Sequence, residues 1–143
     1  MDLALKDLGE LIATALPNEV TATGIANGEL AVSVRSDAIV KVLTFLRDDV
    51  HCQFKVLMDV CGVDYPDREE RFDVVYNLLS MTHNQRVRIK VRTADKKPVP
   101  SVVGVFKSAN WWEREAWDLF GIYFSGHPDL RRILTDYGFE GHP

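Results

Sequence analysis

Residues 72–92 read FDVVYNLLSMTHNQRVRIKVR and contain two β-prone runs separated by a polar turn. Residues 72–80 are almost entirely apolar, and residues 82–85 have the composition of a turn. In residues 86–92 apolar and basic side chains alternate, which is the period of a half-buried strand. The stretch therefore predicts two successive strands, of which the second turns Val87, Ile89 and Val91 toward a core and Arg86, Arg88, Lys90 and Arg92 outward.

The segments before this stretch predict two helices, a hairpin and one more strand. Residues 54–63 (FKVLMDVCGV) form a nearly continuous apolar run, which indicates a central strand covered on both faces. Apolar residues at helical spacing predict helices over residues 3–16 and 36–47, the second capped by Ser36. Between the helices, Asn27-Gly28 separates two β-prone runs and favours a hairpin with a type I′ turn.

Two further helices are expected after the strands. Residues 94–100 (ADKKPVP) interrupt the strand pattern, and Ser101 is suited to cap a short helix over residues 102–106. A longer helix is predicted over residues 111–120, because Gly121 follows where a helix commonly ends.

The order α-β-β-α-β-β-β-α-α is not a repeating βαβ series. It favours an α+β two-layer sandwich, with one mixed β-sheet and helices packed on one face. We assign residues 1–124 to this domain and residues 125–143 to a C-terminal extension rich in Gly, Pro and charge.

Composition narrows the classes of function. The formal net charge of −4 and the pI of about 5.5 argue against generic nucleic-acid binding. No apolar run approaches the roughly 20 residues that span a bilayer, and the start MDLALKDLGE does not resemble a signal peptide. Any membrane association is therefore expected through a partner. Cys52 and Cys61 do not match an iron–sulfur or zinc motif and are interpreted as core residues.

The chain lacks the common motifs of nucleotide-binding and cofactor-binding enzymes, so its histidines are the candidates for chemistry. His127 and His142 each lie in a Gly-His-Pro tripeptide, a spacing that does not place them on one helix face as metal ligands. We interpret them as turn side chains that donate hydrogen bonds to a carbonyl or an acid. The alternative is a stand-alone enzyme in which His127 forms an acid–base pair with Asp129 or Glu115.

The basic row at residues 86–92 has three interpretations. A solvated strand face, which also blunts an exposed sheet edge, ranks first. Docking to an acidic partner ranks second, and nucleic-acid binding a distant third.

The predicted helix at residues 111–120 combines large aromatic and charged side chains. At 100° per residue, Trp112, Ala116, Leu119 and Phe120 share one face, and Glu113 and Glu115 lie on its two flanks. Flanking acids are costly to bury unpaired, and Arg131 and Arg132 are candidate partners. Arg114 and Asp118 form an i,i+4 pair on the opposite face, and Trp117 lies off the apolar stripe. Aromatic residues, arginines and paired acids are typical of an interface, and also of an ordinary well-packed helix. The high Trp content and the small number of aliphatic residues in the C-terminal extension favour the interface.

These residues carry a resemblance to a known family. The pattern is Glu113-Arg114-Glu115, then Asp118-Leu119-Phe120, His127, Arg131 and Ile133-Leu134, continued by LTDYGFEGHP at the C-terminus. It resembles the signature of the 30 kDa subunit of respiratory complex I, which in bacteria is the C-type subunit of the proton-translocating NADH–quinone oxidoreductase. Residues 57–66 and 72–80 are similar to this family too, and the resemblance covers roughly residues 35–143.

The resemblance implies a non-catalytic subunit of the peripheral arm, peripheral on the cytoplasmic side of the bacterial inner membrane or on the matrix side in mitochondria. It implies no flavin, iron–sulfur cluster or quinone in this chain, with FMN and the clusters on other subunits. The implied partners are the 49 kDa-type large subunit and other peripheral-arm subunits, with no nucleic acid. An equivalent subunit of a membrane-bound energy-converting hydrogenase is the alternative parent. Family members usually continue beyond the second Gly-His-Pro, so a longer chain is expected.

The residues that we assign to the interface, or to its support, are Trp112, Glu113, Arg114, Glu115, Trp117, Asp118, Phe120, Gly121, His127, Pro128, Asp129, Arg131, Arg132, Asp136, Gly138, Phe139 and His142.

Overall fold

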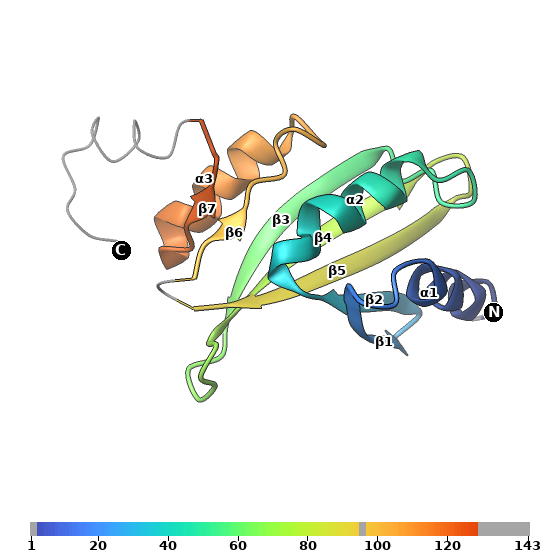
Figure 1. Ribbon diagram of the computed structural model, residues 1–143, viewed down its shortest axis with the longest axis horizontal. Coiled ribbons are helices and arrows are strands. Elements are labelled where there is room, and N and C mark those ends of the chain that lie inside the picture. The colour runs from blue at the N-terminus through green and yellow to red at the C-terminus, as the bar shows by residue number, and fades with distance from the viewer. Residues whose placement is uncertain (1–2, 95–96, 129–143) are drawn as a thin grey trace.

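The computed structural model describes residues 3–94 and 97–128 and shows an α+β fold (Figure 1). A 3₁₀ turn, η1, precedes the second helix. The elements in chain order are α1 (Leu3–Ala15), β1 (Val20–Ala26), β2 (Glu29–Val34), η1 (Ser36–Ala38), α2 (Ile39–Asp48), β3 (Val56–Asp64), β4 (Phe72–Ser80), β5 (Gln85–Thr93), β6 (Val99–Pro100), α3 (Ala109–Phe120) and β7 (Phe124–Ser125).

Five strands form one mixed sheet in the order β1-β2-β5-β4-β3. The β2–β5 pair is parallel and the other neighbours are antiparallel. A second, two-stranded sheet pairs β6 with β7 in parallel. The predicted fold class is confirmed, although the two-residue strands β6 and β7 were not anticipated.

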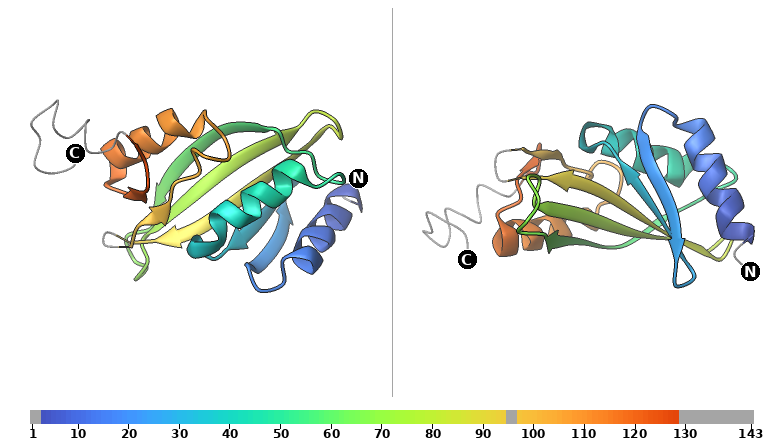
Figure 2. Two further views of the ribbon diagram at one scale, coloured as in Figure 1. Left: turned by 45° about the horizontal axis from the view of Figure 1, so that its top comes forward. Right: turned by 90° about the horizontal axis from the view of Figure 1, so that it is seen from below.

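The alternation in β5 sets which face of the sheet is covered. Val87, Ile89 and Val91 are buried, and their partners across β4 and β2 are buried as well. The helices cover this face, since Gly9 of α1 approaches Leu30 and Phe120 of α3 approaches Gly62 (Figures 1 and 2). The predicted arrangement of one sheet with helices on one face is therefore correct.

Strand β3 is an edge strand, so the prediction that residues 54–63 form a central strand is wrong. Leu57 and Val60 are buried, whereas Val56, Met58 and Val63 are exposed. A bulge between residues 57 and 59 shifts the register, so apolar side chains on both faces read as one continuous run.

The two cysteines differ in their surroundings. Cys52 is fully buried, as expected for a core residue. Cys61 is exposed on the outer face of β3, so its assignment to the core is wrong. The predictions of a central strand and of a buried Cys61 fail for the same reason. Both assumed that the two faces of β3 are covered, and among the described residues nothing covers its outer face.

Local signals at the ends of elements were correct in some places and wrong in others. Asn27 and Gly28 have φ values of 55° and 76°, as a type I′ turn requires, and Gly121 ends α3 with a φ of 74°. Ser36 does not cap α2, because it begins the 3₁₀ turn and the N-cap position falls on Ala38.

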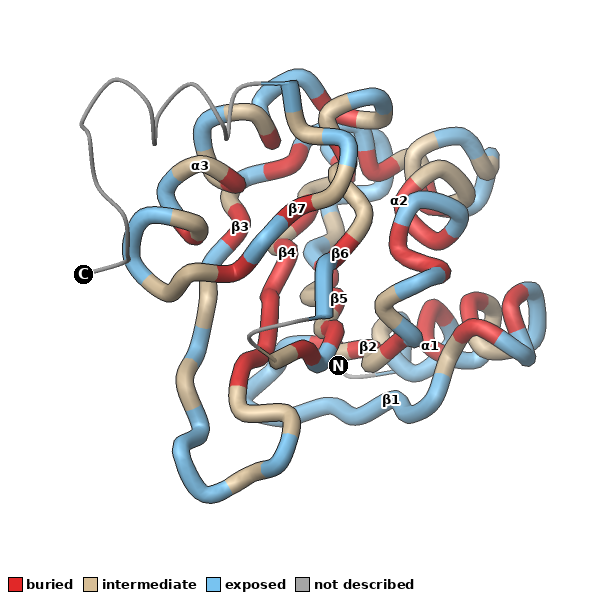
Figure 3. The backbone as a smooth tube through the Cα atoms, turned by 60° about the vertical axis from the view of Figure 1, so that its left-hand side comes forward, coloured by how far each residue is buried: buried red, intermediate tan, exposed pale blue. Residues whose placement is uncertain are grey.

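The basic row lies on a solvated strand face, as the first interpretation had it, but not at a sheet edge. Strand β5 lies between β2 and β4, so its charges do not protect a sheet edge. They stand in the middle of the sheet face that no described helix covers, which we call the uncovered face. The edge strand on that side is β1, which is exposed along nearly its whole length (Figure 3).

Gly62 allows α3 to approach β3 closely. A Cβ atom at residue 62 would lie 2.6 Å from Cδ2 of Phe120, and the Phe120 ring also packs edge-on against Phe72. We expect Gly62→Ala to lower the free energy of unfolding by about 1–3 kcal/mol, because the ring must leave this contact. Urea unfolding measures the change. Gly24→Ala is the control, since a Cβ there meets nothing within 4 Å; equal effects of the two substitutions would contradict this packing.

Candidate functional site

The organising group of the C-terminal region is the carboxylate of Glu113, which has no exposed surface. Its Oε1 accepts a hydrogen bond of 2.7 Å from the Ser101 hydroxyl, and its Oε2 accepts one of 2.8 Å from the Val102 N–H. Both donors follow strand β6. The carboxylate therefore joins α3 to the segment that leads into it.

The predicted helix over residues 102–106 is a turn instead. Val105 and Phe106 donate their N–H groups to the Val102 carbonyl, but the structure describes no helix there. The Ser101 hydroxyl, expected to cap a helix, donates to Glu113. Its oxygen also accepts a hydrogen bond of 3.3 Å from the Val103 N–H, so the local contact of a cap forms although no helix follows.

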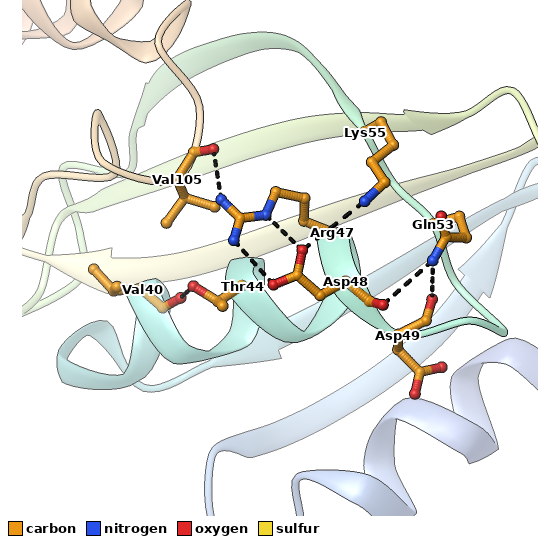
Figure 4. A network of polar contacts seen from close by, with 8 residues as sticks. All are labelled: Val40, Thr44, Arg47, Asp48, Asp49, Gln53, Lys55 and Val105. Atoms are coloured by element: carbon orange, nitrogen blue, oxygen red, sulfur yellow. Dashed lines mark hydrogen bonds and ion pairs between the residues drawn. The ribbon is translucent and has the colours of Figure 1, made fainter.

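The same segment is held from the side of α2 as well. Nη1 of Arg47 donates a hydrogen bond of 3.1 Å to the Val105 carbonyl, while its Nε donates to Asp48 at 2.8 Å (Figure 4). Gln53 donates to the carbonyls of Asp48 and Asp49 just beyond the helix. The Arg47–Val105 bond ties the end of α2 to the segment that supplies the donors for Glu113, and the other contacts hold the end of α2 itself.

His127 closes the cluster from the other side. Its side chain is fully buried, and Nε2 lies 3.0 Å from the Asn110 carbonyl and 3.9 Å from Oε1 of Glu113. A carbonyl oxygen only accepts, so Nε2 is the protonated nitrogen of the ring. The hydrogen bond to a carbonyl agrees with the structural interpretation of this histidine and fastens the chain after β7 to α3.

The buried environment changes the acidity of the cluster. Burial raises the pKa of Glu113 to about 7, and the hydrogen bonds from Ser101 and Val102 counteract part of this effect. Tyr76 lies fully buried in β4, and burial, with a smaller contribution from the charge of Glu113, raises its pKa well above the ordinary value. The cluster is enclosed in the core and acts as an internal polar anchor.

The inner face of α3 differs from the helical projection. The buried residues are Ala109, Glu113 and Ala116, which centres the buried face on the glutamate. Trp117 packs on the core and contacts Tyr123 edge-on at 5.7 Å, so its placement off the stripe is wrong. Leu119 is 58% exposed, so its placement on the stripe is also wrong.

Of the predicted charge pairs around α3, only the Arg114–Asp118 pair lies within the described residues, and it does not form. Arg114 lies over the Trp111 ring at 5.9 Å, and no ion pair with Asp118 occurs among the described residues. Glu113 uses neutral donors from residues 101 and 102. The arginines proposed as its partners lie outside the described residues.

The outward side of α3 carries an exposed surface of mixed character. Trp111 is 59% exposed and Tyr123, just beyond the helix, is 44% exposed. Exposed acids lie beside these apolar groups. We define the α3 surface as Trp111, Glu115, Asp118, Leu119 and Tyr123.

The structure describes ten of the seventeen assigned residues. Glu113 is buried, Trp112, Arg114, Trp117 and Phe120 are half-buried, Gly121 ends the helix, and the side chain of His127 is buried, whereas Glu115, Asp118 and Pro128 are exposed. The others lie outside the described residues: Asp129, Arg131, Arg132, Asp136, Gly138, Phe139 and His142.

Sequence reasoning missed several partners of this region. Trp111, Leu119 and Tyr123 belong to its exposed surface, and Ser101 and Asn110 belong to its buried cluster. Ala109 lies four residues before Glu113 and Ala116 lies three residues after it, so all three share one helix face. This spacing was the signal in the sequence that Glu113 lies on the buried face.

Within the described residues, no helix is long and apolar enough to cross a membrane. The same part of the chain contains no group of three or more His, Cys, Asp or Glu side chains placed to hold a metal ion.

The site therefore consists of a buried polar anchor at Glu113 and an exposed aromatic helix surface, carried on an α+β sandwich. Residues 32–143 match the family described as respiratory-chain NADH dehydrogenase, 30 kDa subunit, and the chain belongs to this family. A relative from Paramagnetospirillum magneticum, named as the C-type subunit of NADH-quinone oxidoreductase, is 65% identical over 100% of this chain and 72% of its own length. A Rhodospirillum rubrum relative of the same name is 61% identical over 97% of this chain and 65% of its own length.

A solved structure shows the same fold in a more distant protein. It belongs to the membrane-bound sulfane sulfur reductase, an archaeal respiratory membrane complex. The TM-score is 0.75 over 96% of this chain and 94% of that chain, at 19% sequence identity. At this identity the likeness shows the fold alone.

Replacing Glu113 by Gln is expected to remove a pH dependence of stability. The pKa of Glu113 is raised from its ordinary value of 4.5 to about 7, so folding binds a proton between these values and wild-type stability falls as pH rises across them. The fall amounts to at most about 3 kcal/mol. The glutamine amide keeps the shape: its oxygen can accept from the Val102 N–H, and its NH2 group can donate to the Ser101 hydroxyl oxygen, which reverses the direction of that bond. The variant should therefore lose this pH dependence and be more stable than wild type at pH 8.

Urea unfolding from pH 4.5 to 8 measures this difference. Glu115→Gln is the matched control, because Glu115 is exposed on the same helix and should leave the wild-type pH dependence intact. If Glu113→Gln and wild type showed the same pH dependence, the assignment of the buried proton to Glu113 would be wrong.

Proposed function

We propose that this chain is a non-catalytic docking subunit of the proton-translocating NADH–quinone oxidoreductase, respiratory complex I, and supports electron transfer from NADH to quinone. Membership of the 30 kDa subunit family is the observation that carries this proposal. The high identity to proteins named as NADH-quinone oxidoreductase subunits supports it over a hydrogenase subunit.

The α3 surface is the region that we propose docks to a partner. Exposed Trp and Tyr side chains supply large contact areas at low entropic cost, and such residues are enriched among the energetically dominant residues of interfaces. The buried anchor at Glu113 fixes the helix before the partner arrives. We infer that the partner is the 49 kDa-type large subunit, with other peripheral-arm subunits nearby.

We infer that the redox cofactors lie on other subunits. Thiolates are the usual ligands of iron–sulfur clusters, but burial raises the pKa of Cys52 to about 12. Burial, followed by the nearby Asp59 carboxylate, also raises the pKa of Cys61. Both thiols are therefore disfavoured as cluster ligands, which supports FMN and the clusters being held elsewhere in the complex.

The acid–base enzyme is the weaker proposal. The side chain of His127 is fully buried against Glu113 and the Asn110 carbonyl, whereas the predicted partner Glu115 is exposed. A substrate would need to reach groups that are already hydrogen bonded within the core. We infer a peripheral position of this subunit on the cytoplasmic side of the inner membrane, or on the matrix side in mitochondria, reached through the complex.

Changes on the α3 surface should weaken assembly without unfolding the chain. Trp111 and Leu119 are exposed, so we expect Trp111→Ala combined with Leu119→Asp to leave the free energy of unfolding within about 0.5 kcal/mol. Loss of about 2 kcal/mol of binding energy would weaken association roughly 30-fold. Native gels and co-purification from cells that carry only the variant measure incorporation into the complex.

Met81→Asp is the control, since Met81 is 77% exposed in the turn between β4 and β5. It should assemble like wild type. Normal assembly of the α3 variant, with only the turnover of the intact complex reduced, would overturn the docking role of this surface.

A further inference from the structure

The uncovered face of the sheet contains a cleft of about 730 Å³ with an excess of positive charge. Its floor is formed by β2 and β5, where Ser33 pairs in register with Lys90. Tyr65 and Arg68, from the loop between β3 and β4, line one side, and residues from β1 line another. We call this region the basic cleft.

Most charges around the cleft already have partners. Nη2 of Arg68 lies 2.6 Å from Oδ1 of Asp73, and Glu70 pairs with Lys97 at 2.8 Å. Arg35 pairs with Asp37 at 3.2 Å. The two acids that line the cleft, Glu70 and Asp73, are therefore already paired with Lys97 and Arg68.

Lys90 and Arg92 are different, because neither side chain has a hydrogen bond or ion pair among the described residues. The neighbours of Lys90 in register are Ser33 and Val75, which carry no charge. The neighbour of Arg92 is Asp73, which Arg68 occupies. By contrast, Arg88 on the same strand lies 3.0 Å from Glu29 and donates to Asn77.

The lining carries four cationic side chains, Arg35, Arg68, Lys90 and Arg92, against the two acids Glu70 and Asp73. The whole chain has a formal net charge of −4, so this local excess opposes the general charge of the molecule. Side chains two residues apart on a strand are about 6.6 Å apart, which is also the repeat of alternate residues in an extended peptide. Two carboxylates at alternate positions thus match Lys90 and Arg92.

We propose that the basic cleft binds an acidic segment of another subunit of the complex, with carboxylates at alternate positions facing Lys90 and Arg92. The inference rests on the proposed function for the identity of the partner as a subunit. Nucleic acid is disfavoured because the Tyr65 ring, the cleft's aromatic side chain, is covered by Arg68 at 4.2 Å. The cleft lies on the uncovered sheet face and forms a second docking site, distinct from the α3 surface.

Peptide binding to the purified full chain tests the chemistry of the cleft. The probe is a labelled peptide of alternating glutamate and serine, and its control replaces each glutamate by glutamine. At low ionic strength we expect the chain to bind the glutamate peptide and not the glutamine control. The double substitution Lys90→Gln and Arg92→Gln should weaken the affinity for the glutamate peptide at least tenfold. Arg86→Gln is the matched control on the same strand outside the cleft and should change affinity less than twofold.

Crosslinking in the intact complex tests the source of the acidic group. A carbodiimide joins amines to carboxylates in direct contact, so mass spectrometry should find Lys90 joined to an acidic segment of another subunit. Lys90 should also be protected from acetylation in the complex, whereas Lys6, on the outer side of α1, should not.

Three results would overturn the inference. The first is an equal loss of peptide affinity in the Lys90→Gln/Arg92→Gln variant and in the Arg86→Gln variant. The second is displacement of the peptide by millimolar phosphate alone. The third is acetylation of Lys90 to the same extent in the complex and in the isolated chain. The last result, in a complex that contains the chain, would leave the proposed function standing. Absence of the chain from the complex would instead contradict the proposed function, while the peptide experiment would still decide the chemistry of the cleft.

Discussion

The register between β4 and β5 is the constraint on which the rest of the molecule depends. Its antiparallel ladder pairs Tyr76 with Ile89 and Asn77 with Arg88, so apolar pairs alternate with pairs that contain a basic residue of β5. A slip of one residue would exchange the two faces and place the basic row in the core. Because the apolar pairs lie on one side, the described helices pack there, and the charges of β5 remain on the other.

Helix α3 packs on the covered side of the sheet and presents its exposed residues as the surface that we propose binds a partner. The close approach of Phe120 to Gly62 sets the helix against the edge strand, and the Glu113 carboxylate fastens its first half to the segment after β6. A charged group without exposed surface normally costs stability, and here two hydrogen bonds offset part of that cost. The helix is thus held firmly, which leaves Trp111 free to face outward.

The parts of the fold that sequence reasoning found are those with local causes. Strand β5 alternates strictly, and the Asn27-Gly28 turn needs two residues with positive φ, so both were predictable. The errors arise where a distant contact decides. The apolar residues of β3 do not show in the sequence that one face of the strand is uncovered. Ser101 keeps a local hydrogen bond from the Val103 N–H, but the sequence does not show that its hydroxyl also donates to the distant Glu113. Strands of two residues leave almost no periodic signal.

The most direct measurement of the central claim is hydroxyl-radical footprinting of the chain, free and within the intact respiratory complex. Trp111 and Tyr123 are exposed in the isolated chain and should be oxidised readily there. In the complex, docking through α3 predicts strong protection of both rings, with Met81 at the far turn oxidised at the same rate in both states. Equal oxidation of Trp111 and Tyr123 in the free and assembled chain would contradict the account.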